Sequence, residues 1–265
     1  MRSLIIMTTL LSMLALACEP SDQPRGPSQP YTGEILDQVS TPPAYFGLDP
    51  YYTKYLDADG IPIFAGVEIP DDAIFRIRTN VTRMVSGEEL MRRRLIDNYV
   101  RIAVLALIDP IDTIPELANK TLLPDQRSRP GDQELALMVV PEENVLCFPN
   151  DPSEGDDVFV RTFALTMLQT AIPLLEPSFP DSLLAAYERI LQSGIWDNTL
   201  AAQSKEDYYA EGVQSYFNLN QQADPTDGRH NLVDTRIELK AYDPALYGLV
   251  ERFFEGVEEI ESCNY

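Results

Sequence analysis

Residues 207–217 read DYYAEGVQSYF and place the carboxylate of Glu211 in the middle of a run of aromatic and small residues. Ser204 is a preferred N-cap residue, so we expect a helix that begins there and runs through Phe217. The aromatic side chains recur at helical spacing, which predicts that they belong to the core rather than to a ligand-binding stripe. They are Tyr208, Tyr209, Tyr216 and Phe217.

Further helices are predicted around this one. Residues 160–167 (VRTFALTM) lie in a helix that Asp156 or Asp157 caps and that Pro173 stops after about Ile172. Two more helices are expected, one from Asp181 or Ser182 through Leu191 with its end at Gly194, and one from Asp243-Pro244 to about Phe254. The second half of the chain is therefore predicted to be mostly helical.

The first half mixes helical and strand patterns. Apolar positions from Asp71 to about Val85 recur at helical spacing, and residues 86–89 (SGEE) predict a capping box for a second helix. Two apolar, β-branched runs, Tyr99 to Leu107 and Glu134 to Val140, predict strands. Residues 56–60 (LDADG) are interpreted as a turn, because the calcium-loop pattern is incomplete. These elements predict an α+β fold with a small sheet in the first half and a helix-rich second half.

The chain is expected to divide into a signal peptide (1–17), a Pro-rich flexible linker (18–48) and one domain (49–265). Arg2, the apolar run from Leu4 to Ala17 and the small-x-small end of that run are typical of a secretory signal. Residues 15–18, ALAC, are also similar to a bacterial lipobox, so lipid anchoring through Cys18 is the alternative to free secretion. No later segment approaches the roughly 18 apolar residues of a transmembrane helix.

The net charge is −22, from 20 basic and 42 acidic residues. Nucleic acid and anionic membrane surfaces require basic faces, so this balance disfavours both classes of partner, and we expect no nucleic acid to bind. Because the acids are dispersed, they are interpreted as solubilising surface charge. Diffuse, weak binding of calcium or of cationic partners is the alternative.

Two cysteines remain beyond the expected cleavage site, Cys147 and Cys263. In an oxidising compartment they predict one disulfide, whereas in cytosol two buried free thiols are expected. Asn80 and Asn119 lie in N-x-T sequons and are candidate glycosylation sites in a eukaryotic source.

Several segments together resemble secreted metallopeptidases related to the anthrax lethal factor catalytic domain. The resemblance covers most of residues 50–255. It rests on the order and spacing of residues 52–63 (YTKYLDADGIPI), 193–196 (SGIW), 208–217 (YYAEGVQSYF), 227–231 (DGRHN), 234–239 (DTRIEL) and 242–244 (YDP). It implies a zincin-like domain, in which an H-E-x-x-H helix and a glutamate on a later helix bind zinc.

This chain departs from that motif. Glu211 matches the glutamate ligand, but Arg161 and Leu165 stand where the histidines are expected and Thr162 where the general base is expected. The sequence holds one histidine, His230, so H-E-x-x-H cannot occur anywhere in it. We therefore expect no metal, no other cofactor and no catalytic residues. We also expect an ion pair between Arg161 and Glu211 in the space of the zinc.

His230 lies in a polar turn, and we interpret it as structural or solvent-facing rather than catalytic. The resulting hypothesis is a secreted, catalytically inactive metallopeptidase homologue that binds an extracellular protein, peptide or matrix component. One alternative is an acidic extracellular matrix or mineral-associated protein with weak calcium binding. Another is a hydrolase of unrecognised mechanism that uses Glu211.

Overall fold

The computed structural model describes residues 38–123, 126–257 and 259–263. The predicted signal peptide and most of the predicted linker lie outside these residues. No helix within the described ranges combines the length and the apolar character needed to cross a membrane.

Four strands form one mixed sheet in the order β1-β2-β3-β4: Lys54–Ala58, Ile61–Ala65, Arg101–Leu105 and Leu137–Pro141. β1 and β2 pair antiparallel, while β2-β3 and β3-β4 pair parallel. The strand predictions for β3 and β4 are confirmed. The interpretation of residues 56–60 as a turn is correct only for Asp59 and Gly60, whose φ angles are 52° and 95°. The residues before them belong to β1, because this two-residue connection closes a β-hairpin.

The two faces of the sheet are buried by different parts of the chain. Alternate side chains such as Ile63, Ile102 and Val104 pack against α1 (Asp71–Met84) and α4 (Val158–Thr170) in the larger core cluster. The opposite face, with Phe64 and Ala103, packs against aromatic residues before β1 and short 3-10 turns after β3. The turns after β3 are Ile111–Thr113 and Pro115–Leu117, and another 3-10 turn, Ala44–Phe46, carries aromatic residues before β1.

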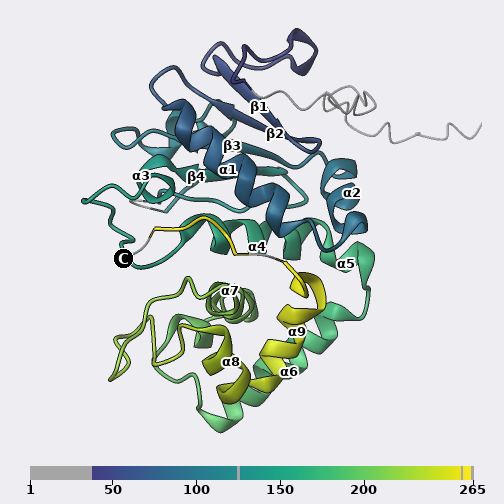
Figure 1. Cartoon of the computed structure of the whole chain (residues 1–265), viewed down its shortest axis with the longest axis vertical. Coiled ribbons are helices and arrows are strands. Elements are labelled where there is room, and N and C mark those ends of the chain that lie inside the picture. The colour runs from purple at the N-terminus through teal and green to yellow at the C-terminus, as the bar shows by residue number, and fades with distance from the viewer. Residues whose placement is uncertain (1–37, 124–125, 258, 264–265) are drawn as a thin grey trace, which may run out of the picture.

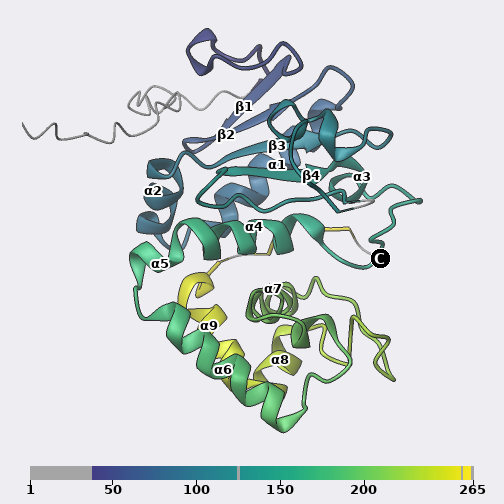
Figure 2. The ribbon, with the colours of Figure 1, turned by 180° about the vertical axis from the view of Figure 1, so that it is seen from behind.

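The second half is helical, as predicted, and packs below α4 in Figure 1, on the side away from the sheet. It contains α5 (Ile172–Leu175), α6 (Phe179–Ser193), α7 (Lys205–Tyr216), α8 (Arg236–Tyr242), α9 (Pro244–Phe254) and a 3-10 turn (Leu200–Ala202). α4 lies between the sheet and these helices in both views, with α7 directly against it (Figures 1 and 2). The fold is therefore α+β, with α4 joining its two halves.

Most helix boundaries agree with the sequence pattern. The Ser204 hydroxyl accepts the backbone N–H of Asp207 at 3.0 Å and caps α7, and Asp243 caps α9 in the same way. Asp157, rather than Asp156, caps α4. These helices begin where predicted because each has an oxygen-bearing side chain at its first turn.

Other boundaries were predicted wrongly. α4 ends at Thr170, close to the predicted end before Pro173, but a short helix that was not predicted, α5, follows at once, because Pro173 occupies its first turn, where the missing N–H costs no hydrogen bond. Pro180 plays the same part in α6, which begins at Phe179. The capping box at residues 86–89 is absent: α2 (Glu89–Asp97) is capped by Glu88, while Ser86 donates its hydroxyl to the Arg83 carbonyl. α3 (Glu142–Val145) and α8 were not predicted.

The predicted disulfide is confirmed: Cys147 and Cys263 are bonded, with their Cα atoms 5.4 Å apart. Of the two sequon asparagines, Asn119 is exposed, whereas Asn80 is buried on α1. The Asn80 side-chain amide donates to the Glu261 carbonyl at 2.8 Å. A glycan on Asn80 therefore requires the segment around Glu261 to be displaced.

Candidate functional site

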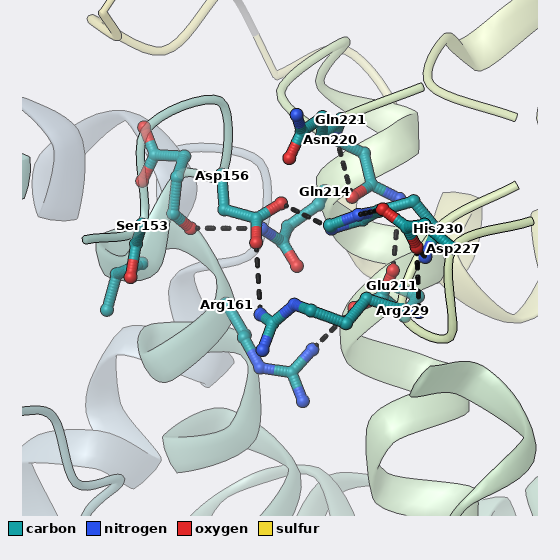
Figure 3. Close-up of polar contacts among 12 residues, drawn as sticks. Ser153, Asp156, Arg161, Glu211, Gln214, Asn220, Gln221, Asp227, Arg229 and His230 are labelled. Carbon is teal, nitrogen blue, oxygen red and sulfur yellow. Dashed lines mark hydrogen bonds and ion pairs between the residues drawn. The ribbon is translucent and has the colours of Figure 1, made fainter. Parts of the chain in front are cut away.

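The candidate site lies where α4 packs against α7. Arg161 on α4 points toward α7, and its Nη1 lies 2.7 Å from Glu211 Oε1 (Figure 3). Its Nη2 pairs with Asp207, one turn earlier on α7. The expected ion pair between Arg161 and Glu211 is confirmed, and Asp207 extends it to a triad.

Glu211 is held in a site that leaves its carboxylate little access to water. The side chain is only 4% exposed. Its second oxygen accepts a hydrogen bond from Asn220 Nδ2 at 3.1 Å. Burial raises the pKa of the Glu211 carboxyl above its ordinary value, and the Arg161 guanidinium opposes that rise. The carboxylate is thus stabilised by a permanent cation and one amide rather than by solvent.

His230 lies between two carboxylates, one of which, Asp156, directly precedes the N-cap of α4. Its Nε2 is 3.0 Å from Asp156 Oδ1, and its Nδ1 is 3.1 Å from Asp227 Oδ2. The hydrogen bond with Asp156 is the main cause that raises the pKa of His230, to about 9. At 4% exposure the residue does not face solvent, so that alternative is wrong. At neutral pH it is a buried imidazolium with both ring N–H groups donated to carboxylates.

Asp156 and Asp227 are themselves fixed by neighbouring groups. Asp227 Oδ1 accepts the backbone N–H groups of Arg229 and His230 at 2.8 and 2.6 Å, and these bonds hold the pKa of Asp227 below its ordinary value. Asp156 Oδ2 lies 3.1 Å from Arg229 Nη2. Burial by itself would raise the pKa of Asp156, but the bond and charge of His230 outweigh it and the pKa is lowered.

The other two positions of the degenerate motif lie on the same helix. Thr162 is buried at 2% exposure, whereas Leu165 is half-buried one turn after Arg161. Gln214, one turn after Glu211, is 1% exposed, and its Oε1 has no hydrogen-bond partner among the described residues. In the described ranges no group of three or more His, Cys, Asp or Glu side chains is arranged to hold a metal ion.

An open pocket of about 470 Å³ continues along the same helix junction. Its apolar wall includes Leu168 of α4 and Leu183 of α6, and its polar rim includes Gln169, Lys205 and Glu206. Gln169 lies two turns after Arg161 on α4, and Glu206 directly precedes Asp207, so the pocket is formed in part by the same two helices as the ion-pair triad. The pocket has room for a side chain of a ligand. The charged groups of the triad are less available to a ligand, because they already pair with one another.

The sequence identified Arg161 and Glu211, but it did not identify Asp156, Asp207, Asp227, Arg229 or Asn220 as members of the site. The one local signal is the DGR turn before His230, because an aspartate at this position commonly accepts the following N–H groups. Nothing in the local sequence joins that turn to α4. No protein-family model, curated protein or solved structure matches this chain.

Proposed function

We propose that this chain is a secreted, zincin-like protein whose zinc site has been replaced by a salt bridge, and that it acts by binding rather than by catalysis. The observation that carries the proposal is the 2.7 Å contact between Arg161 Nη1 and Glu211 Oε1. It is supported by the order of the elements, in which a mixed sheet precedes α4, and α4 precedes the helix that bears Glu211.

A guanidinium in this position is chemically incompatible with a metal bound to Glu211. Arg161 stays protonated at any physiological pH, so a divalent cation would meet a fixed positive charge within hydrogen-bond distance of its ligand. Leu165 offers no lone pair, and Thr162 is no general base near neutral pH. The carboxylate that would serve as a ligand instead stabilises the packing of α4 on α7.

The 470 Å³ pocket formed in part by α4 and α7 is the binding site that we assign to the proposed function. An apolar wall with a polar rim is typical of sites that accept one side chain of a peptide. We expect Gln169→Trp to fill the pocket and abolish binding of peptides selected from a random phage-displayed library. Gln192→Trp, on an exposed position of α6 outside the pocket, is the matched control and should leave binding intact. Equal binding by both variants would refute the assignment.

Zinc content tests the proposed origin of the site. The purified, chelator-treated chain should hold close to no zinc, while Arg161→His/Thr162→Glu/Leu165→His should bind about one equivalent through Glu211. A glutamate at the buried position of Thr162 is costly to the fold, so the double variant Arg161→His/Leu165→His, which keeps Thr162, is tested as well. In either variant, Glu211→Gln should remove the zinc.

Two outcomes would contradict the proposal. One equivalent of zinc in the wild-type chain would mean that other ligands bind it. Folded variants that bind no zinc would mean that α4 is not equivalent to an H-E-x-x-H helix. The first result would reopen the enzyme alternative, and the second would withdraw the zincin-like assignment.

A further inference from the structure

Residues 259–263 lie along α1 and are held there like a bound peptide (Figure 1). Asn80 makes a reciprocal pair with the backbone of Glu261, donating to its carbonyl at 2.8 Å and accepting its N–H at 2.9 Å. Arg83 Nη1 and Arg76 Nη2 donate to two other carbonyls of the segment, at 3.0 and 2.5 Å. These α1 residues follow one another at intervals of four and three, so one face of the helix binds the segment.

The segment also covers a buried asparagine that organises the start of α4. Cys263 Sγ is 3.2 Å from the carbonyl oxygen of Asn144, a residue with 4% exposure. The Asn144 side chain donates to the Asp156 carbonyl and accepts the Val158 N–H, both at 2.8 Å. A hollow of about 10 Å³, close to the volume that holds one water, lies beneath the segment and is lined in part by Asn144.

These contacts join the disulfide to the candidate site in a short series. Cys263 touches Asn144, Asn144 fixes the backbone of Asp156, and the Asp156 carboxylate holds His230 at 3.0 Å. Water that reached Asn144 would compete for the bonds that fix Asp156. The position of Asp156 therefore depends on the segment that excludes water from this region.

We propose that the Cys147–Cys263 disulfide is a redox-controlled clasp, and that its reduction releases residues 259–263 and loosens the Asp156–His230 pair. The inference concerns the side-chain cluster itself and holds whether or not the pocket binds a peptide. Both cysteines are half-buried, so a small reductant can reach them.

The reductant is a dithiol, and the exchange balances in two steps. One thiolate of the dithiol attacks Cys263 Sγ, forming a mixed disulfide, while the electron pair of the broken S–S bond leaves with Cys147. The second thiolate then attacks the reductant sulfur and frees Cys263, so that the dithiol becomes a disulfide and both cysteines gain a proton. Arg76 Nη1 donates to Cys147 Sγ at 3.2 Å and would stabilise that departing thiolate.

The single histidine of the chain makes the test specific. In ¹⁵N-labelled protein prepared without a histidine tag, the two imidazole N–H groups report on the bonds to Asp156 and Asp227. With the disulfide intact we expect both protons to exchange slowly with water. Excess dithiothreitol should accelerate exchange of the proton bound to Asp156 by about tenfold or more, while the amide signals of α9 stay dispersed.

Three variants separate the clasp from other causes. Cys147→Ser/Cys263→Ser should exchange fast and should not respond to dithiothreitol. Asn80→Ala should give intermediate exchange with the disulfide intact, because it removes the reciprocal pair with the segment. Arg93→Ala, at a 66% exposed side chain on α2, is the matched control and should behave as wild type.

Two results would overturn the proposal. One is unchanged exchange at His230 after alkylation has shown that both cysteines are reduced. The other is collapse of the α9 amide signals together with the histidine signals, because that would be global unfolding rather than release of a local clasp.

Discussion

Arg161→Met should destabilise the protein by leaving the Glu211 carboxylate buried without its cation. The Glu211 side chain is 4% exposed and would retain one charge-neutral partner, Asn220. Removing one member of a buried ion pair costs about 3 to 5 kcal/mol. We expect the lower end, because Asn220 remains and because Asp207, at 24% exposure, can be hydrated. For a chain of this size the loss corresponds to a fall in Tm of roughly 6 to 12 °C.

The assay is urea unfolding followed by the fluorescence of Trp196, the only tryptophan and a residue with 1% exposure. The matched double variant Arg161→Met/Glu211→Gln should regain most of the lost stability, because it removes the buried charge together with its partner. The deficit of Arg161→Met should also shrink between pH 7 and pH 5. Loss of the guanidinium raises the folded-state pKa of Glu211 further above its unfolded value, so the carboxyl becomes protonated, and less costly to bury, as the pH falls.

A loss below about 1 kcal/mol at pH 7 would show that the pair behaves like an exposed salt bridge. A double variant no more stable than Arg161→Met would show that Arg161 contributes by packing rather than by neutralising Glu211. Either result would refute the role given to the ion pair.

Three further predictions concern other parts of the chain. Gly212→Ala should lower the free energy of unfolding by about 1 to 3 kcal/mol, because the new Cβ would lie 2.7 Å from a leucine side chain of α9. Gly248→Ala, whose Cβ would meet nothing within 4 Å, should instead raise it by up to about 1 kcal/mol, and thermal melts of the two variants test the difference. The folded-state pKa of His230, about 9, is raised above the unfolded value of 6.5, so its contribution to stability is complete below pH 6.5 and is lost as the pH rises through 9. The pKa difference corresponds to a loss of roughly 3 kcal/mol, which solvent screening at the exposed Asp227 reduces. Urea unfolding midpoints measured between pH 6.5 and 9 should fall in wild type but not in His230→Gln. Cys147→Ser/Cys263→Ser opens a loop of 116 residues and should lower the free energy of unfolding by about 3 kcal/mol, measured against the oxidised wild type by urea unfolding.

Local sequence chemistry predicted much of the secondary structure. α1, α7 and α9 combine helical spacing of apolar residues with a defined start, and both properties are readable within about 15 residues. β1 and β2 escaped prediction because their sequences, KYLDA and IPIFA, include charged residues or a proline and lack the long β-branched, apolar run that predicted β3 and β4. α8 has seven residues, but its Thr235–Glu238 capping box was present in the sequence and could have identified it.

Composition and the aligned motif also predicted part of the site. The resemblance, together with the single histidine, led to the expectation that Arg161 pairs with Glu211, and the packing of α4 on α7 brings the two side chains together. The disulfide was likewise expected from two cysteines in a chain that was predicted to be exported.

The rest depended on tertiary structure. His230 and Asp156 are 74 residues apart, and the polar DGR turn gave no indication that the imidazole would be buried. Its burial is tolerable only because the turn before α4 brings Asp156 to one ring nitrogen while Asp227 holds the other. A charged side chain can leave water only where its partners converge. That convergence is a property of the packed chain and of no single segment within it.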